Sequence, residues 1–492
     1  MATSSIGALP LLRNGEEYLS QSKKTLIGIN GERLLDVSIA PEMHIQLALP
    51  INKGAGFQLL QSMSIDDVID IYVEAGKVFQ NDMLINGIST SLEEFSELIC
   101  LSTGMPITYV NNALNIIPQL FQKCSLKRIL RASSPTGSLA IYDDFVDVRG
   151  NTRFAWSPKG RNCGVALPGN HPSVSLMGAI IPLFKVPTIL RASSSEPFTS
   201  FRLCKALWEA GLPSESLFHF VTEHSSVDAI VRQSDLGVIF GNEWILKAYE
   251  KNSHIKTYGP GRSKILVDIE NMSPTLMNLS LEIAYRSITL DGGRGCINAS
   301  GIVFNGDDGY EEFKGKLAER LASVQPLNPM DPKAEIPAMQ PDPCRRLYKF
   351  IRSRIKNDVN DITAKYRGFE EFIQVEDNLA YLLPTLLEVG EESAIRTDEY
   401  PFSFGTIVQP RDYYAEELME DSLSVGYLTD EPSKAKNLIR NPTVKKVFVN
   451  DQTFLMDIAQ PHENFLADFL YMSKATNYDG VNNYLIKNDA YR

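Results

Sequence analysis

The sequence predicts an α/β protein organised around parallel β-sheet. Three observations lead to this fold class. Short apolar segments alternate with amphipathic ones between residues 164 and 269, the rhythm of parallel strands joined by crossover helices. Glycine or proline turns follow several of the apolar segments. A chain of 492 residues, 43% of them hydrophobic, is long enough to bury a large core without disulfides or metal ions.

The first third of the chain is expected to be mainly helical before its pattern changes. Apolar residues recur every three or four positions in segments 65–79 and 92–101, so residues 62–133 are predicted to be mostly helix. Between residues 137 and 158 the apolar residues alternate with polar ones around Gly150-Asn151, which predicts a β-hairpin.

The central region then alternates between strand and helix. Five strands are predicted, at residues 165–167, 188–191, 218–222, 237–240 and 264–269. Pro172 is expected to open the helix after the first strand, and Ser195 to cap the helix after the second. A helix at 278–290 and a strand at 301–304 follow, and the last fifty residues are less regular.

Composition excludes several classes of protein. Acidic residues outnumber basic ones by 60 to 48, a net charge of −12 that argues against a nucleic-acid binder. The longest apolar stretch, 176–190, is too short to span a bilayer and contains Lys185. No secretory signal is visible in residues 1–10, and the six cysteines form no Cys-x-x-Cys pair. We therefore expect a cytoplasmic protein with free thiols, no membrane span and no metal site.

One cysteine stands in a sequence that suits covalent catalysis. Cys296 follows Gly292-Gly293-Arg294-Gly295, and glycines before a cysteine let the backbone approach a ligand closely. A helix starting near Cys296 would direct free N–H groups at the thiol and lower its pKa. The alternative is a buried cysteine after a flexible turn, which these residues alone favour.

Three loops after predicted strands carry polar side chains that suit a ligand site at the carboxyl edge of an α/β sheet. Asn170, after the first strand, offers an amide donor for a developing oxyanion, or simply caps a helix. Arg191 to Pro197 delivers a cation and several hydroxyls to a helix start, a combination that suits phosphate. Gly241-Asn242 follows the fourth strand, and no Gly-x-Gly-x-x-Gly motif is present.

These elements occur in the order and approximate spacing of the aldehyde dehydrogenase superfamily, over about residues 140–410. Asn170 and Pro172 resemble its oxyanion loop, and Arg191 to Pro197 its adenosine-ribose loop. Phe240-Gly241-Asn242 is similar to its Phe-x-Gly-Ser turn, and Gly293 to Ser300 to its Gly-Gln-x-Cys-x-x-x-Ser motif. Glu399 resembles the glutamate that holds the nicotinamide ribose. The resemblance implies a Rossmann-type cofactor domain, an α/β catalytic domain and a β-ribbon oligomerisation arm.

One departure from the superfamily decides the expected reaction. The segment Tyr258 to Lys264 resembles the superfamily's Glu-Leu-Gly-Gly-Lys-Ser-Pro, so the glutamate that activates water in hydrolytic members is Tyr258 here. A phenol with a pKa near 10 is a poor base at neutral pH. The residues most resemble CoA-acylating aldehyde dehydrogenases and the fatty acyl-CoA reductases of the bacterial luminescence type. Segments 194–199 and 310–314 are similar to segments of those reductases.

The resemblance implies reduction of an acyl thioester to an aldehyde through an acyl group on Cys296, with Asn170 at the oxyanion. It implies NADPH, with NADH left open, and coenzyme A as co-substrate. Arg191 and Ser194 favour a 2′-phosphate, and Glu196 opposes it. Ser193 is also expected to bind the cofactor. The cofactor set also includes Gly241, Asn242 and Glu399. A homodimer or homotetramer is expected, and the acyl donor is CoA, a carrier protein or an acyl-activating partner enzyme.

The predicted organisation has five parts. They are an N-terminal helical part of the cofactor domain (1–136), an oligomerisation hairpin (137–158), an NAD(P)-binding domain (159–262), a catalytic domain (263–440) and a C-terminal return segment (441–492).

Two other functions stay open at this point. An ordinary NAD(P)-dependent aldehyde dehydrogenase would need a base in place of Tyr258, and Glu243 and Glu399 are the candidates. His171, beside Asn170, either assists proton transfer or caps a helix, and the second interpretation is favoured. A non-catalytic protein that keeps the fold as a binding module is the remaining alternative, although Cys296 and Asn170 argue against it.

Overall fold

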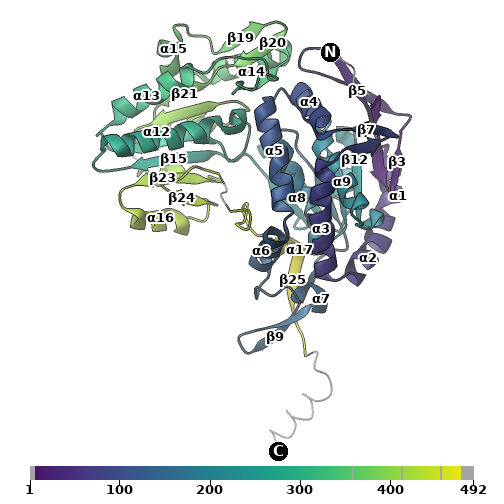
Figure 1. Ribbon diagram of the computed structural model, residues 1–492. Coiled ribbons are helices and arrows are strands. Elements are labelled where there is room, and N and C mark those ends of the chain that lie inside the picture. The colour runs from purple at the N-terminus through teal and green to yellow at the C-terminus, as the bar shows by residue number, and fades with distance from the viewer. Residues whose placement is uncertain (1–5, 357, 412–413, 455–456, 478–492) are drawn as a thin grey trace, which may run out of the picture.

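The computed structural model describes residues 6–477 except 357, 412–413 and 455–456. Two helix-covered, mainly parallel sheets lie side by side, and a narrow ribbon projects below them (Figure 1). Each half has its own hydrophobic core, around Tyr72 and Phe201 in the first and around Phe313 and Leu386 in the second. Within the described ranges, no helix combines the length and the apolar character needed to cross a bilayer.

The first sheet contains seven strands in the order β14-β13-β10-β11-β12-β2-β3. Its bounds are β10 (Cys163–Ala166), β11 (Thr188–Ala192), β12 (Leu217–Val221), β13 (Leu236–Phe240), β14 (Ile255–Tyr258), β2 (Leu11–Arg13) and β3 (Glu16–Tyr18). From β10 the chain moves outward through β11 and β12, then returns to add β13 and β14 on the other side. The strand order therefore reverses beside β10, where α/β sheets bind ligands at the carboxyl edge.

Two helices of this half, α3 (Ile65–Gln80) and α4 (Leu92–Thr103), begin at serines that form capping boxes. The helices of this half are α1 (Glu42–Ile51), α2 (Phe57–Ser62), α3, α4, α5 (Ile107–Leu120), α6 (Lys123–Ser133), α8 (Ser175–Ala179), α9 (Phe198–Glu209), α10 (Val227–Val231) and α11 (Glu243–Tyr249). Ser64 and Ser91 form capping boxes at α3 and α4, and Gly104 ends α4 in the left-handed conformation.

The first half differs from the sequence predictions in two respects. The part at 1–136 that is predicted to be helical also contains strands: five occur within residues 8–38, and β6 (Met83–Ile85) and β7 (Ile88–Thr90) form a hairpin after α3. β1 (Ala8–Leu9), β5 (Arg33–Ser38) and β4 (Lys23–Ile27) form a separate small sheet. Ser195 does not cap α9, since the helix begins at Phe198 and the buried Glu196 carboxylate accepts from Thr199 N at 2.8 Å.

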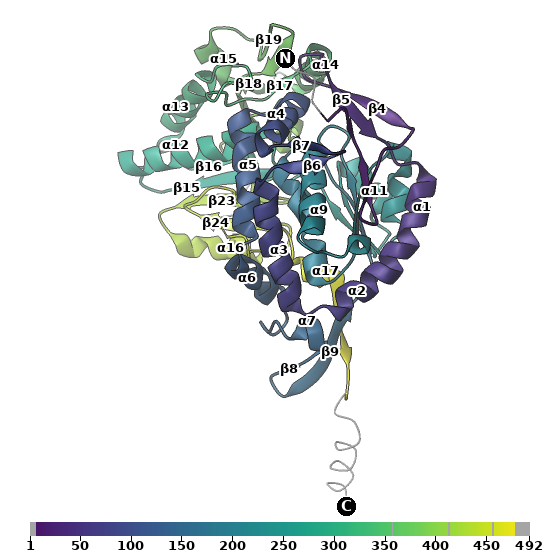
Figure 2. The same cartoon turned by 45° about the vertical axis from the view of Figure 1, so that its right-hand side comes forward.

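The second sheet has the order β18-β21-β22-β16-β15-β23-β24. Its strands are β15 (Ser263–Asp268), β16 (Ala299–Asn305), β18 (Val359–Asp361), β21 (Thr385–Val389), β22 (Phe404–Val408), β23 (Val425–Thr429) and β24 (Val447–Val449). Helices α12 (Pro274–Thr289), α13 (Tyr310–Ala322), α14 (Pro341–Arg354), α15 (Ile362–Arg367) and α16 (Ala435–Arg440) accompany it (Figure 2). A small sheet of β17 (Ala338–Met339), β20 (Leu379–Leu382) and β19 (Ile373–Glu376) lies beside α14.

The connection between the two sheets is four residues long. β14 ends at Tyr258 and β15 begins at Ser263. All the pairings of β14 and β15 are parallel, so the chain leaves the carboxyl edge of the first sheet and enters the amino edge of the second. These two edges therefore face each other.

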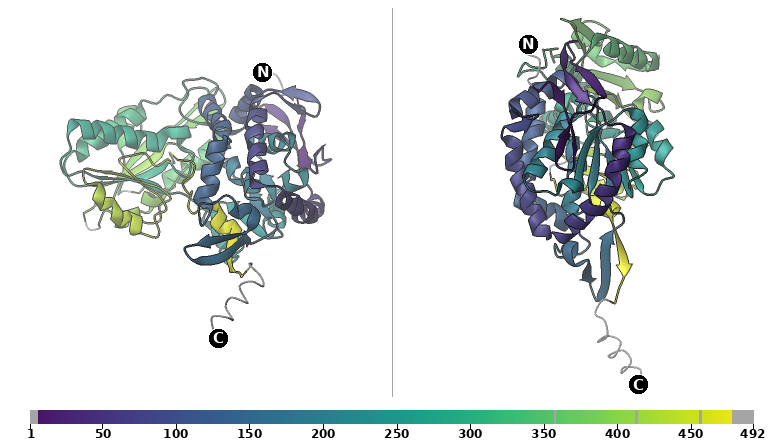
Figure 3. Two further views of the ribbon diagram at one scale, coloured as in Figure 1. Left: turned by 60° about the horizontal axis from the view of Figure 1, so that its bottom comes forward. Right: turned by 90° about the vertical axis from the view of Figure 1, so that its right-hand side faces the viewer.

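The ribbon consists of β8 (Val146–Arg149), β9 (Thr152–Pro158) and β25 (Tyr471–Ala475), with β9 in the centre. The hairpin turn lies at Gly150-Asn151, where the sequence placed it. Residues 137–145 are not strand, however, because α7 (Ile141–Asp144) precedes β8. The C-terminal segment crosses from the second half through α17 (Leu466–Leu470) to reach the ribbon, which stands clear of the body (Figure 3).

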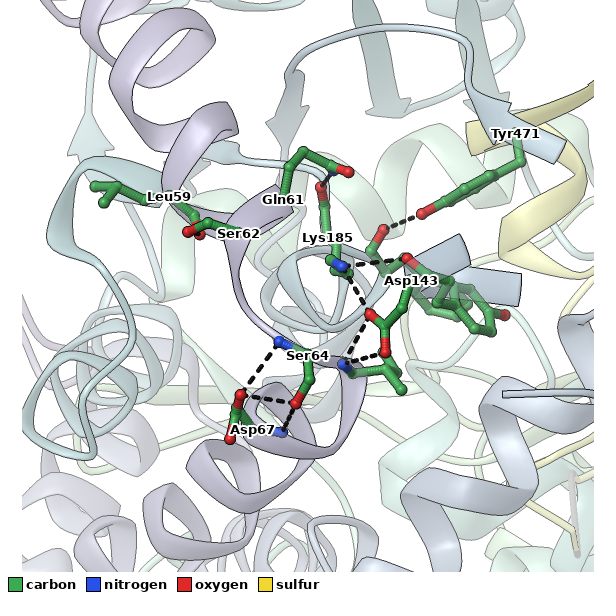
Figure 4. A network of polar contacts seen from close by, with 11 residues as sticks. Leu59, Gln61, Ser62, Ser64, Asp67, Asp143, Lys185 and Tyr471 are labelled. Atoms are coloured by element: carbon green, nitrogen blue, oxygen red, sulfur yellow. Dashed lines mark hydrogen bonds and ion pairs between the residues drawn. The ribbon is translucent and has the colours of Figure 1, made fainter. Parts of the chain in front are cut away.

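A buried lysine ties the base of the ribbon to the helices. Lys185 Nζ, fully buried, donates to Tyr142 O at 3.1 Å and to Asp143 Oδ1 at 2.8 Å (Figure 4). Both Asp143 oxygens also accept from Ile65 N, at the first turn of α3. On the other side, Tyr471 of β25 donates its hydroxyl to Phe184 O at 2.7 Å. The ammonium of Lys185 is thus compensated by groups from α7.

Removal of Asp143 is expected to destabilise the protein by about 3 kcal/mol, because it leaves the Lys185 ammonium buried with only a carbonyl oxygen. Lys185→Met keeps the apolar contacts of the side chain and leaves a partly exposed carboxylate, so its cost should stay below about 2 kcal/mol. Urea unfolding of Asp143→Ala and Lys185→Met measures both. Equal losses in the two variants would contradict this account of the network.

Candidate active site

Cys296 lies in a turn directly before β16, at the amino edge of the second sheet. The turn is closed by Asn298 N donating to Gly295 O at 3.0 Å and by Gly295 N donating to Asn298 Oδ1 at 2.8 Å. The expectation that a helix starts here and lowers the pKa of the thiol is wrong. The pKa of Cys296 is raised to about 11, mainly by burial and also by the Glu399 carboxylate, against the opposing effect of Lys446.

Several segments hold this turn in place. Ser263 Oγ donates to Cys296 O at 2.9 Å, and Thr453 Oγ1 donates to Ile297 O at 2.6 Å. The backbone of Gly261 lies so close that a Cβ there would stand 1.7 Å from Cys296 O. Gly293, at φ +72°, packs in the same way against the backbone between Phe402 and Ser403. Both glycines are therefore required by close approach of two backbones.

Asn170 reaches the Cys296 turn from the first sheet. It follows β10, and its Nδ2 donates to Arg294 O at 3.1 Å, two residues before the cysteine. Its buried Oδ1 has no hydrogen-bond partner in the part of the chain that the structure describes. The two residues that the sequence named as catalytic are thus brought to one place, although they lie on different sheets.

Arg294, which stands where the superfamily motif has glutamine, anchors the turn to the helices. It is partly buried, and its Nη1 donates to Thr103 O at the end of α4, at 2.7 Å. Desolvation lowers the pKa of its guanidinium to about 10. The side chain therefore ties the Cys296 turn to the end of α4.

His171 has the structural role that the sequence favoured. Its Nδ1 accepts from Ser173 N at 3.2 Å, which caps the short helical segment Pro172–Val174. Its Nε2 lies 3.0 Å from Asp291 Oδ2, on the segment that precedes the Cys296 turn. His171 thus links the Asn170 loop to the Asp291 segment instead of facing the thiol.

The proposed phosphate loop lies at the carboxyl end of β11. Arg191 is buried and donates to Thr222 through Nε and Nη2, at 3.4 and 3.3 Å. The Ser193 and Ser195 hydroxyls lie 2.9 Å apart, and a Cβ on Gly169 would stand within 2.4 Å of both. Ser194 is partly buried between them. The loops after β10 and β11 are therefore in direct contact.

The loop after β13 completes this edge. Asn242 caps α11, accepting from Ile245 N at 3.1 Å, and a Cβ on Gly241 would meet the Ile245 side chain at 2.7 Å. The predicted turn residues are thus confirmed as the entrance to a helix. The loop also brings Glu243 into an ion pair with Arg262.

Tyr258, at the position of the superfamily's glutamate, is buried and packs against an aromatic side chain. The Tyr258 ring stacks on Phe240 with centroids 4.8 Å apart, and burial raises the pKa of its phenol well above 10. Glu399 is also engaged, because its partly buried carboxylate accepts from Arg262 N at 2.7 Å. Together with the Glu243–Arg262 ion pair, this occupies both carboxylates named as alternative bases.

Two residues near the thiol were missed by the sequence reasoning. His462 Nε2 lies 3.8 Å from Cys296 Sγ, and the buried Lys446 ammonium is close enough to lower the pKa of the cysteine. Both come from the C-terminal segment, which carries no motif and no helical or strand periodicity. Nothing in the sequence distinguishes His462 from the other five histidines.

Comparison with known proteins identifies relatives. A family model described as acyl-CoA reductase (LuxC) matches residues 60–341, more than half of the chain. The long-chain acyl-protein thioester reductase of Vibrio harveyi is 23% identical over 345 residues, which are 65% of this chain and 66% of that protein. The chain thus spans just under two thirds of the length of that relative.

Solved structures share the fold. The aldehyde dehydrogenase KauB of Pseudomonas aeruginosa superposes with a TM-score of 0.75 at 17% identity, covering 95% of this chain and 96% of that one. An NAD+ complex of an aldehyde dehydrogenase from Bacillus cereus superposes with a TM-score of 0.75 at 14% identity, with 95% and 96% covered. The fold is therefore that of the aldehyde dehydrogenases, as the sequence predicted.

The raised pKa of Cys296 has a direct consequence for its reactivity. Because the thiolate is the reactive form, alkylation by iodoacetamide should accelerate about tenfold per pH unit between pH 8 and 10, levelling off near pH 11. An unstructured cysteine peptide, whose thiol titrates near 8.5, should level off about two units earlier. Peptide mass spectrometry in a Cys124→Ser background measures the rate. A plateau below pH 8 would show that the site stabilises a thiolate.

Proposed function

Because the chain belongs to the acyl-CoA reductase (LuxC) family, we propose that it reduces an acyl thioester to an aldehyde with a nicotinamide hydride, through an acyl group carried on Cys296. The observation that carries the proposal is the meeting of Asn170 with the Cys296 turn. A nucleophile and an amide donor from opposite sheets form the minimal arrangement for acyl transfer.

In the first half of the reaction, Cys296 Sγ attacks the acyl carbonyl and negative charge develops on its oxygen. An amide group has two N–H donors, so Asn170 can hold Arg294 O with one and the substrate oxygen with the other. The Cys296 backbone N–H is the second donor to the oxyanion. The thiol of the donor departs and an acyl-Cys296 thioester remains.

In the second half, a bound nicotinamide cofactor supplies the hydride that reduces the acyl carbon. The same two donors hold the oxygen while its charge develops again, and the Cys296 sulfur leaves as the aldehyde is released. Tyr258 decides the fate of the acyl-enzyme in the absence of hydride. Its stacked, un-ionised phenol is a poor base for water, so a thiol such as that of coenzyme A is the better acceptor.

The carboxyl edge of the first sheet fits a nicotinamide dinucleotide. The Gly241-Asn242 turn and the Asn170 loop flank the point where the strand order reverses, and the serine hydroxyls lie beside them. We assign Arg191, Ser193 and Ser194 to the 2′-phosphate and so favour NADPH over NADH. The Glu196 carboxylate does not oppose this, because it is turned inward and bonded to the start of α9. Glu399 stays our proposal for the nicotinamide ribose.

The remaining expectations are also proposals. All six cysteines are free thiols, which supports a reducing compartment such as the cytoplasm. The projecting ribbon of β8, β9 and β25 supports a homodimer or homotetramer. CoA, a carrier protein or an acyl-activating partner enzyme delivers the acyl group.

Turnover in the reverse direction tests the reaction class. Aldehyde oxidation with NADP+ is expected to require CoA, since the un-ionised Tyr258 phenol cannot activate water as the superfamily's glutamate does. Cys296→Ala should abolish turnover, and Asn170→Ala should lower kcat by roughly 100-fold to 1,000-fold, the usual cost of one oxyanion donor. Nicotinamide fluorescence follows the reaction, with Cys124→Ala and Asn151→Ala as exposed controls. Release of free acid without CoA would establish the ordinary aldehyde dehydrogenase instead.

Cofactor preference tests the phosphate assignment. Arg191→Gln removes a cation but keeps hydrogen-bond donors, so the ratio of kcat/KM for NADPH over NADH should fall about tenfold or more. Steady-state kinetics with both cofactors gives this ratio, which a general loss of stability leaves unchanged. An unaltered ratio would remove Arg191 from the 2′-phosphate site.

A further inference from the structure

The thiol of Cys296 has a histidine beside it that the reaction described so far does not use. His462 Nε2 lies 3.8 Å from Cys296 Sγ, within hydrogen-bonding range for sulfur. The other ring nitrogen, Nδ1, is buried and has no hydrogen-bond partner among residues 6–477 as far as they are described. The ring therefore directs Nε2 at the sulfur, and Cys296 Sγ is its hydrogen-bond partner within the described part of the chain.

Contacts with β14 hold the histidine in this position. The His462 ring stands edge-on to the Tyr258 ring, with centroids 5.5 Å apart and planes at 89°. The next residue, Glu463, pairs with Lys256 at 2.6 Å, and the Lys256 ammonium lies 5.0 Å from the centroid of Tyr258. His462 thus packs against Tyr258, the residue that replaces the superfamily's glutamate.

The charges around the pair keep both partners neutral at rest. Burial lowers the pKa of His462 to about 3, with Lys446 and Lys256 acting in the same direction. Burial also raises the pKa of the thiol, with Glu399 and Glu463 acting in the same direction and Lys446 against them. The buried Lys446 ammonium has no hydrogen-bond partner among the described residues, so its charge is available to the reacting groups.

We propose that His462 is the acid–base residue of the acyl-transfer step, and this rests on the function proposed above. Nε2 accepts the Cys296 proton while Sγ forms its bond to the acyl carbon. It returns that proton to the sulfur of the departing thiol as the old carbon–sulfur bond breaks. The donor leaves as a neutral thiol, and the histidine is neutral again before hydride transfer.

The surroundings favour the return of the proton to the departing thiol. An imidazolium formed beside Lys446 and Lys256 is a strong acid, so it passes its proton readily to a thiolate leaving group. After reduction, Cys296 leaves as a thiolate and recovers a proton from solvent. The sum is one thioester, one reduced nicotinamide and one proton converted to aldehyde, thiol and oxidised nicotinamide. Lys446 acts on the same sulfur as a positioning charge.

Acyl transfer without cofactor isolates this step. Quenched-flow mass spectrometry of the full-length protein with acyl-CoA alone measures acylation of Cys296. In His462→Asn the rate is expected to fall by about 100-fold to 1,000-fold at pH 7. Reduction of enzyme acylated beforehand, started with NADPH, should change less than threefold. His254→Asn, before the amino end of β14 and away from the site, is the matched control.

The pH profile separates a chemical role from a packing role. Acylation of the unaltered protein should be nearly independent of pH from 5.5 to 7.5, because a neutral base takes the proton from a neutral thiol. In His462→Asn and His462→Gln the rate should rise about tenfold per unit over that range, since only the thiolate then reacts. A lower rate with an unchanged slope, or normal acylation, would overturn the role of His462. Absence of acyl-Cys296 in the unaltered protein would overturn the proposed function as well.

Discussion

The site depends on the four-residue connection between the two sheets. Residues 259–262 carry the chain from the carboxyl edge of one sheet to the amino edge of the other, which is too short a path for the edges to separate. The Asn170 loop and the Cys296 turn meet for this reason. Gly261 allows the connection to lie against the Cys296 carbonyl, and Glu399 fixes it by accepting from Arg262 N.

Burial of this meeting point sets its chemistry. The protein carries a net charge of −12, yet the groups that bear on Cys296 include a buried lysine as well as two carboxylates. Desolvation and these charges together keep the thiol protonated. The thiol therefore has to lose its proton during the attack, because no thiolate is present beforehand. A proton acceptor within reach of the sulfur should consequently accelerate the attack more here than in a site with an ionised cysteine. His462 occupies that place.

The replacement at Tyr258 has two consequences. It removes the base that would activate water, and it supplies an aromatic surface that packs against Phe240 on one side and His462 on the other. A carboxylate at this position would lie among apolar rings and close to Glu463. The proposed loss of the hydrolytic path and the placement of the histidine therefore follow from the same substitution.

The sequence by itself determined the features that depend on local backbone preference and on residue order. These are the alternation of strands and helices, the Gly150-Asn151 turn, and the motifs around Asn170, Gly241 and Cys296. The errors occurred where a neighbouring residue or a distant segment decided the outcome. Glu196 rather than Ser195 bonds the start of α9, and strands within residues 8–38 exist because other strands pair with them.

Only the tertiary structure decided the environment of the nucleophile. Cys296 and His462 are 166 positions apart, and Lys446 precedes a short edge strand in a segment without recognisable pattern. The expected low pKa of the thiol is reversed because its pKa depends on burial and on charges from distant segments, which residue order does not encode. The motif could name the proposed nucleophile, but the packing of the C-terminal segment determines which groups surround its thiol.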